Sequence, residues 1–412
     1  MTTTNFTGKT IYVPYMCDHA FVLAAGLESA GLKAEVLPAT TDETFALGLE
    51  NLVGKECSPC FTTTGDALQL ARRPGFDPRA SLLLMPTAGG PCRFGQYRVV
   101  QRDVLDDHGL QDLEIISMTA DNSYQGFGDN PTQFRLLLWD GVVLVDLLQR
   151  LLFAHRPYER EPGQTDAVYQ ESLRRITEAT RAGGGKRFDT ELTWIAEAFA
   201  ALPIQRDRPR LIIALVGEIY LRFNDYANQN IIRQVEAVGG EIVLSSMMEW
   251  LYFTNWEYIR KTKQVGRYGA MLTTRLADLY QRYREHRFAR RVAHLLPHPY
   301  EATSKQLMQN LRPYYDTVLG TEAVLTLGEA IEMAKHGASG ILSILPFSCM
   351  PGIISAGLAP RIRADFDNIP WLDVIFDAQG STNFNTRLEA FMYQAAQYYH
   401  RVVVGNKARS GF

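Results

Sequence analysis

The sequence has few cysteines, no excess of either charge and no long uncharged apolar run. Its 412 residues include 42 Lys and Arg, 45 Asp and Glu and five Cys, and the formal net charge is -3. Without a basic excess, the composition gives no basis for non-specific binding to nucleic acid. The longest apolar stretch, residues 136–153, contains Asp140, Asp146, Gln149 and Arg150. We therefore expect a buried or amphipathic helix there rather than a membrane span.

The N-terminus also lacks a basic segment followed by a long apolar core, so no secretory signal is predicted. These features together predict a cytoplasmic protein without a membrane partner. Disulfide frameworks are rare in the cytosol, which makes a different role for the cysteines more plausible.

Strand and helix patterns alternate in two parts of the chain, separated by a helical part. The strands are predicted at residues 11–15, 34–37, 81–85 and 113–118, and again at 211–216, 241–244, 341–345 and 372–376. Such alternation predicts parallel sheets with right-handed crossovers, and hence an α/β fold. We predict a first α/β domain at 1–130, a helical segment at 131–205, and a second α/β domain at 206–412 with a helical insertion at about 255–320.

Three cysteines lie where loops lead into predicted helices. Cys92 and Cys349 each follow a predicted strand, and Cys57 shortly precedes a helix. Ligands of open α/β sheets bind beyond the carboxyl ends of the strands. Thiolates at helix N-termini suit an anionic iron–sulfur cluster, because backbone N–H groups there can donate to its sulfurs.

Other interpretations of the cysteines remain open. Cys17, behind the first strand, is expected to be a packing residue. Cys57 and Cys60 form a Cys-x-x-Cys pair that could be a redox dithiol. Structural zinc sites usually combine two such pairs, and the sequence has one, so iron–sulfur is favoured over zinc.

Several other side chains are candidates for the same site. Glu218 follows a predicted strand and is either a general acid/base or a charge at a helix N-terminus. Arg93 could stabilise the negative charge of a cluster or pair with a carboxylate, and His19 could donate a proton or simply begin a helix.

Two larger groups of residues have a structural and a functional interpretation. The aromatic residues at helical spacing are expected in the core, with a substrate pocket as the alternative; they are Trp250, Tyr252, Phe253, Trp256 and Tyr258. The basic run is expected on a solvated helix face, with docking of an acidic partner or of phosphate groups as the alternative; it comprises Arg282, Arg284, Arg287, Arg290 and Arg291.

Three cysteine motifs together resemble the superfamily of 2-hydroxyacyl-CoA dehydratase component D and benzoyl-CoA reductase. They are GKECSPC at 54–60 with Gly65 and Asp66, GPCRFGQY at 90–97 and PFSCMPG at 346–352. GEIY at 217–220, NQN at 228–230 and TRLEAF at 386–391 are similar to the same superfamily. The nearest branch is the one associated with CoA-substrate-specific enzyme activases, which includes double-cubane cluster proteins.

The resemblance implies two flavodoxin- or Rossmann-like domains with an iron–sulfur cluster between them. By position, Cys57, Cys92 and Cys349 would be ligands, with Cys60 either a fourth ligand or a ligand of a second cube. A [4Fe-4S] cluster is expected. The alternative, a double-cubane [8Fe-9S] cluster, normally uses more thiolates than the five of this chain.

The function implied is that of a reductase or dehydratase-type component of anaerobic metabolism. It would receive low-potential electrons from an ATP-hydrolysing activase and pass them to a small substrate such as an acyl-CoA, as a homodimer or with a related subunit. The glycines at 183–185 follow no predicted strand and lack the Ser or Thr of a phosphate loop, so ATP hydrolysis is assigned to the activase. The alternatives are a non-catalytic electron carrier and a thiol-disulfide protein using Cys57 and Cys60.

Overall fold

The computed structural model describes residues 6–87, 92–118, 130–207, 210–297, 302–317, 321–377 and 383–404. Two four-stranded sheets contain β1 (Thr10–Val13), β2 (Lys33–Val36), β3 (Ser81–Leu84) and β4 (Glu114–Ile116), and then β5 (Leu211–Gly217), β6 (Gly240–Leu244), β7 (Gly340–Pro346) and β8 (Trp371–Phe376). All strand pairs are parallel. The predicted α/β fold with two parallel-sheet domains is therefore confirmed.

The two sheets have the same strand order. The first sheet is ordered β2-β1-β3-β4 and the second β6-β5-β7-β8. In each sheet the chain therefore adds its second strand on one side of the first strand and its third strand on the other side. This is the order of the first four strands of a flavodoxin-like sheet, whose ligands bind at the reversal point. The central strands β3 and β7 are buried along their whole length, as expected for parallel strands covered on both faces.

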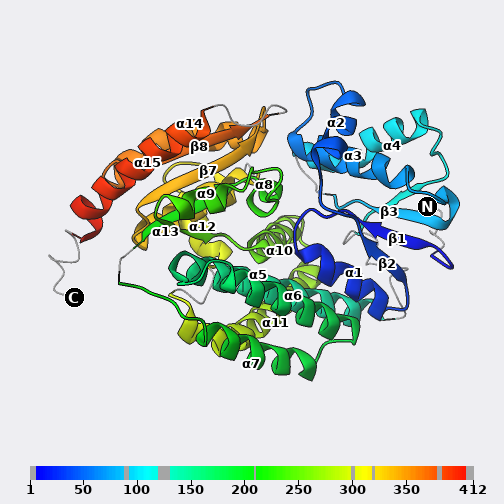
Figure 1. The fold of residues 1–412 in the computed structure, drawn as a ribbon, viewed down its shortest axis with the longest axis horizontal. Helices are drawn as coiled ribbons and strands as arrows, with labels where there is room; N and C mark the ends of the chain where they lie inside the picture. Colours follow the sequence, from blue (N-terminus) through cyan, green and yellow to red (C-terminus); the bar gives the residue numbers. More distant parts are fainter. Residues whose placement is uncertain are drawn as a thin grey trace.

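The helices of the first part lie around its sheet, at the blue and cyan end of the molecule in Figure 1. They are α1 (His19–Ser29), α2 (Asp42–Glu50), α3 (Ser58–Ala71) and α4 (Tyr97–Asp107), with short 3-10 turns η1 (Pro78–Ala80) and η2 (Arg93–Gln96). The second sheet carries α8 (Ile219–Phe223), α9 (Ile231–Ala237), α13 (Ala323–Lys335), α14 (Met350–Asp365) and α15 (Phe384–Tyr398), followed by the π-helical turn η6 (Tyr399–Val404).

The remaining helices form a layer beside both sheets (Figure 1). They are α5 (Pro131–His155), α6 (Gln164–Arg181), α7 (Lys186–Ala200), α10 (Met247–Gln264), α11 (Tyr268–Val292) and α12 (Ser304–Leu311), with η3 (Arg156–Tyr158) and η4 (Ala293–Leu295). The helix α5 contains the long apolar stretch and is largely buried. In the part of the chain that the structure describes, no helix is long and apolar enough to cross a membrane.

The sequence patterns missed the helix α2 and the starts of other helices. The helix α2 was not predicted, although Thr41 and Thr44 form a capping box at its start. The helix α3 begins at Ser58, directly after Cys57, and α10 begins at Met247, ahead of the helical insertion predicted from about 255. In α3, the run of threonines hides the helical pattern because it has little apolar periodicity.

Glycines allow α2 and α3 to touch backbone to backbone. A Cβ at Gly65 would lie 1.7 Å from the Thr44 carbonyl oxygen, and one at Gly48 would lie 1.9 Å from that of Phe61. No other residue fits at these two positions without moving a helix. This contact fixes the direction of α3, and therefore the position of the cysteine at its N-terminus.

The triple glycine between α6 and α7 is a chain reversal. All three residues have positive φ, at 87, 66 and 65°, which explains the composition of the loop. A Cβ at Gly184 would lie 2.4 Å from the Phe188 ring, so this glycine also makes room for a core side chain.

Candidate cysteine site between the two sheets

Three cysteines occupy the same local position, the N-cap of a helix. Cys57 precedes α3, Cys349 precedes α14, and Cys92 precedes the turn η2 that leads into α4. All three have extended backbone and make no side-chain capping hydrogen bond. The predicted positions of these cysteines, in loops ahead of helices, are confirmed.

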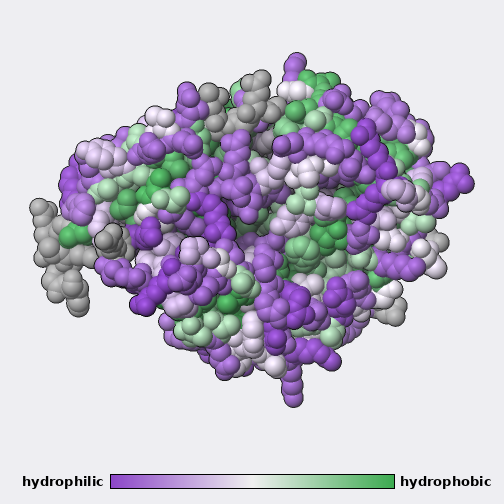
Figure 2. All heavy atoms as spheres, in the orientation of Figure 1, coloured by the Kyte–Doolittle hydropathy of each residue, from purple (hydrophilic) through white to green (hydrophobic). Residues whose placement is uncertain are grey.

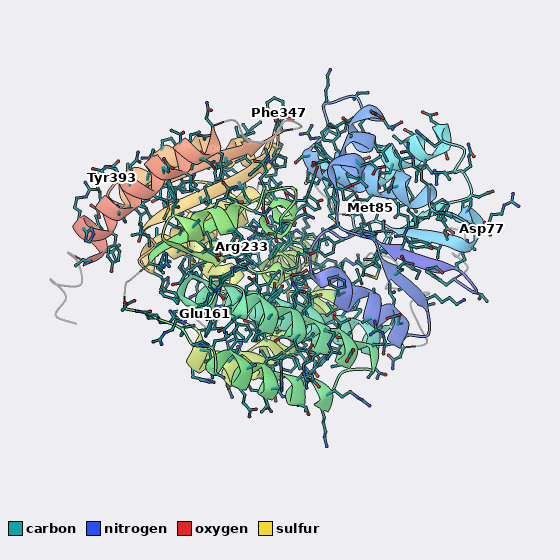
Figure 3. All side chains as sticks on the ribbon, viewed as in Figure 1. Asp77, Met85, Glu161, Arg233, Phe347 and Tyr393 are labelled. Carbon is teal, nitrogen blue, oxygen red and sulfur yellow. The ribbon has the colours of Figure 1, made fainter. Side chains whose placement is uncertain are left out.

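The two sheets place Cys92 and Cys349 in equivalent positions. Cys92 lies between β3 and α4, and Cys349 lies between β7 and α14. Since β3 and β7 hold the same place in the two sheet orders, each cysteine follows the third strand of its sheet, at the point where the order reverses. In Figure 3, Phe347, two residues before Cys349, lies at the boundary between the two halves of the molecule.

The side chain of Arg93 connects the loops that contain the three cysteines. Its guanidinium donates through Nη1 to the Lys55 carbonyl oxygen at 2.7 Å, and through Nη2 to the Ser348 carbonyl oxygen at 2.6 Å and Oγ at 3.0 Å. Lys55 lies two residues before Cys57, Ser348 immediately precedes Cys349, and Arg93 itself follows Cys92. One side chain thus links all three loops across the two domains.

The electrostatics of the thiols also place them in one neighbourhood. Burial raises the pKa of Cys349 to about 12, and the charges of Glu218, Cys57 and Cys92 add to the shift. Burial likewise raises the pKa of Cys92 to about 12, with contributions from Glu322, Glu218 and Cys57. A cysteine of the second domain is therefore close enough to two cysteines of the first for their charges to interact.

Opposite influences act on the pKa of Cys57, and the net result is a raised value. Burial raises its pKa, while the charge of Arg93 and a hydrogen bond from the Tyr97 hydroxyl favour the thiolate. Tyr97 is buried beside Cys57, Cys60 and Met85, and its own pKa is raised well above the usual value, first by burial and then by Cys57. Tyr97 lies within the GPCRFGQY motif, but its contact with Cys57 could not be read from the sequence.

Glu218 lies next to the same cysteines and begins a helix. Its carboxylate accepts hydrogen bonds from the backbone N–H groups of Tyr220 at 3.1 Å and Leu221 at 2.8 Å, so it caps the short helix α8. Burial raises its pKa, and these two hydrogen bonds oppose the shift. The preceding Gly217 has φ 121°, and a Cβ there would lie 2.0 Å from the Ile344 carbonyl oxygen of β7. A glycine is therefore needed to bring Glu218 beside the loop after β7.

Glu322 is a second carboxylate at the site that sequence reasoning did not find. It is the N-cap residue of α13, and burial raises its pKa. Its charge also raises the pKa of Cys92 more than the charge of any other residue does. No local pattern marks this residue, because it is 230 positions from the cysteine that it affects.

Cys60 lies on the inner side of α3, one turn after Cys57. It is fully buried, and burial raises its pKa to about 12, while a hydrogen bond to Thr64 opposes the shift. A redox dithiol needs an accessible thiol with a lowered pKa. Cys60 has neither property, so Cys57 would be the attacking thiol in the dithiol interpretation.

His19 and Cys17 occupy a separate buried position behind β1. The His19 ring contacts Asp146 through Nε2 at 3.0 Å, and Asp146 also accepts from the backbone N–H groups of Met247 and Met248 at the start of α10. Burial lowers the pKa of His19, but Cys17 and Asp146 outweigh it and raise the value to about 10. The contact of His19 with Asp146 therefore connects α1, α5 and α10. Cys17 is also buried, as expected of a packing residue.

The aromatic group and the basic run have mainly structural roles. Tyr252 and Phe253 are buried, whereas Tyr258 is exposed. Of the five arginines in the run, four make ion pairs with carboxylates of the same chain: Arg282 with Asp278, Arg284 with Asp140, and Arg287 and Arg291 with Asp189.

A cavity of about 880 Å³ lies away from the cysteines, and residues of two other predicted motifs, NQN at 228–230 and TRLEAF at 386–391, contribute to its walls. It is lined by α9 and the start of α15, with the side-chain amides of Gln229, Gln234, Asn383 and Asn385 among its walls. None of the cysteines contributes to it.

Among the described residues, no three His, Cys, Asp or Glu side chains lie together as ligands of a single metal ion. The thiolates of an iron–sulfur cluster bind different irons and stand apart by the width of the cluster, so this observation does not address a cluster site. No protein-family model and no curated protein matches the chain.

Proposed function

We propose that this protein holds an iron–sulfur cluster between its two domains, with Cys57, Cys92 and Cys349 as ligands. The observation that carries the proposal is the meeting of three cysteine loops, each ending at a helix N-cap, around Arg93. It agrees with the resemblance of the three motifs to the 2-hydroxyacyl-CoA dehydratase and benzoyl-CoA reductase superfamily.

The donor set fits such a group. Four thiols, including Cys60, share one largely buried neighbourhood, and Arg93 is the cation in contact with their loops. Burial keeps these thiols protonated in the absence of a positive charge, and iron would supply that charge and displace the protons. A cluster bound here would supply low-potential one-electron chemistry.

The residues of the chain would orient and insulate this centre. Cys57, Cys92 and Cys349 would bind the cluster, while Tyr97 and Arg93 donate hydrogen bonds at or beside Cys57. Glu218 and Glu322 lie beside the thiols, and burial raises the pKa of both carboxyls. We propose Glu218 as the acid/base group toward a small substrate such as an acyl-CoA.

We further propose that the electrons come from a separate ATP-hydrolysing activase. Exposed apolar side chains flank two of the cysteines in sequence, namely Val53, Phe347 and Ile353. We propose that these side chains form part of the surface that the activase contacts. The loop at 183–185 is a chain reversal. We therefore expect that the purified chain alone does not hydrolyse ATP. Hydrolysis of ATP at enzyme-like rates by the chain alone would contradict the assignment of this activity to the activase.

The test is metal content after anaerobic purification or reconstitution with iron and sulfide. We expect about four irons and four sulfides per chain and a brown colour. Cys92→Ser and Cys349→Ser should each lose most of the iron and the EPR signal of the reduced protein, because serine is a poorer ligand. Cys17→Ser is the matched control and should keep both. Full iron content in the two ligand variants would refute the assignment.

A second measurement separates an enzyme from an electron carrier. If the chain is catalytic, Glu218→Gln should keep its iron and its EPR signal but lose activase-dependent turnover of substrate. If Glu218→Gln keeps full turnover, the acid/base role is wrong while the cluster assignment stands.

A further inference from the structure

The helix α11 carries an exposed apolar stripe along its length. Tyr268, Leu272, Leu276, Leu279 and Tyr283 are between 56 and 64% exposed. We call these five residues the α11 stripe. Single exposed apolar residues are common, but a contiguous row of large ones is typical of an interaction surface.

The spacing of the stripe is that of a helix-pairing seam. Its members follow one another at intervals of four, four, three and four residues, so they lie along one side of the helix. Alternating intervals of three and four are the pattern of a and d positions in coiled coils. Such a seam buries its side chains only when a second helix lies along it.

The described part of the chain leaves this seam exposed. The helix α11 packs into the core near its C-terminal end through Phe288, Ala289 and Val292, and it pairs with α10 on another side. Its arginines Arg284 and Arg287 reach back to Asp140 on α5 and Asp189 on α7. These contacts fix α11 on the body of the protein with the stripe facing solvent.

The charges beside the stripe are partly neutralised within the chain. Four of the five arginines in the C-terminal half of α11 are held in ion pairs. Lys263, Arg267, Arg275 and Arg290 are exposed. Four such residues are the lower limit of the roughly four to eight basic residues of a segment that binds anionic lipid, so the vesicle measurement below distinguishes a membrane surface from a second copy.

The area of the stripe is sufficient for a dimer. Five side chains that each expose more than half of their surface offer about 500–600 Å² per copy, and Tyr280 beside them raises this to roughly 600–700 Å². Two copies would bury about 1,200–1,400 Å², which lies within the range of stable interfaces.

We propose that the α11 stripe is the contact between two copies of this chain, with the two α11 helices antiparallel. The central residues Leu272, Leu276, Leu279 and Tyr283 are spaced four, three and four, which reads the same in both directions. A two-fold axis through the midpoint between Leu276 and Leu279 therefore places Leu276 of one copy in the same layer as Leu279 of the other, and Leu272 in the same layer as Tyr283, so the same surface is used on both copies, as an isologous interface requires. This inference names a surface for a homodimer and does not depend on the cluster.

The test is the oligomeric state in solution, by sedimentation velocity or light scattering. The wild-type chain should be dimeric in the micromolar range. Leu276→Glu combined with Leu279→Glu should raise the dissociation constant at least 100-fold. Tyr393→Glu, on α15 at the far end of the molecule, is the matched control and should stay dimeric, since Tyr393 is 67% exposed but outside the stripe (Figure 3).

Circular dichroism checks that the double variant is folded. Because both leucines are exposed, their substitution should leave the spectrum of the folded protein unchanged. If the double variant fails to fold, Leu279→Ala alone should still weaken the dimer measurably. A wild-type chain that is monomeric at about 100 µM would overturn the proposal. So would a double variant that stays dimeric, or a monomeric chain that binds phosphatidylserine vesicles through these leucines.

A crosslinking experiment tests the antiparallel register. An equimolar mixture of Leu276→Cys and Leu279→Cys chains should form the mixed disulfide in preference to either symmetric one, because positions 276 and 279 of opposite copies share a layer. Predominance of the symmetric 276–276 disulfide would indicate parallel helices and contradict the proposed two-fold arrangement. The mixed peptide is identified by mass spectrometry.

Discussion

Arg93 and Ser348 are joined across the two domains. The Arg93 guanidinium donates to both the carbonyl oxygen and the hydroxyl of Ser348, which are 255 residues away in sequence. Ser348 has φ 56°, a left-handed conformation that non-glycine residues adopt at a cost. Backbone strain of this kind is typical of functional sites, where the surroundings hold it in place. In this protein the residue with positive φ immediately precedes Cys349 and lies in the loop that Arg93 contacts.

Replacing Arg93 should loosen this connection. Arg93→Ala removes three hydrogen bonds from a partly exposed guanidinium, so we expect the free energy of unfolding to fall by about 1–2 kcal/mol. Because the three cysteine loops would no longer be held together, the reconstituted variant should also lose iron to a chelator faster than wild type. Arg98→Ala is the control, as Arg98 is exposed on the next turn of α4. Equal chelator resistance of the Arg93 and Arg98 variants would show that Arg93 does not organise the site.

Ser348 allows the backbone strain to be measured separately from the hydroxyl. Both Ser348→Ala and Ser348→Gly lose the Oγ contact with Arg93, but only glycine relieves the positive φ. We expect the glycine variant to be more stable than the alanine variant by about 1 kcal/mol in urea unfolding. Ser355, inside α14, gives the matched comparison. There the order should reverse, with alanine more stable than glycine by about 1 kcal/mol. The same order at both positions would contradict the assigned strain.

The duplicated sheet order explains what the sequence could and could not reveal. The eight strands were predictable because β3, β5 and β7 are short apolar runs between turn residues. The loop positions of Cys57, Cys92 and Cys349 followed from these strands and from the helices after them. The helices α2 and α3 were partly missed because close glycine contacts, rather than an apolar stripe, hold them together.

The long-range parts of the site had no sequence signal. The contact of Arg93 with Ser348 and the approach of Glu322 to Cys92 depend on how two domains meet. Local periodicity reports which face of an element is buried, but it does not report which loop faces another across a domain boundary. The similarity of the two sheet orders is likewise a three-dimensional property, because the two halves share no short repeat.

The buried Asp66 of α3 should make stability depend on pH. Burial raises its pKa to about 6 from 3.8, although hydrogen bonds from Thr40 and Thr44 oppose the shift. The folded state therefore binds the Asp66 proton more tightly than the unfolded state does. The contribution of Asp66 to the free energy of unfolding is fully present below about pH 4 and is lost as the pH rises through 6.

Asp66→Asn removes this titration. The stability of the variant relative to wild type should increase by about 2–3 kcal/mol between pH 4 and pH 7 and then stay constant. Asp66→Ala should give the same rise, since it also removes the carboxyl, even if its absolute stability is lower. The measurement is urea unfolding at several pH values. Parallel pH profiles for wild type and both variants would exclude Asp66 as the source of the dependence.

Cys60 decides whether the proposed cluster has three protein thiolates or four. It lies one turn after Cys57 on α3, is fully buried, and interacts electrostatically with both Cys57 and Arg93. A thiol in this position is close to the three proposed ligands, and a buried thiol can bind a cluster without access to solvent. We therefore expect Cys60→Ser to lower the iron content per chain and to change the EPR spectrum, whereas Cys17→Ser leaves both unchanged. Cys60→Ala separates ligation from packing, because it removes the donor atom with a small change in volume. If both Cys60 variants keep full iron and the wild-type spectrum, Cys60 is a packing residue and the centre has three protein thiolates.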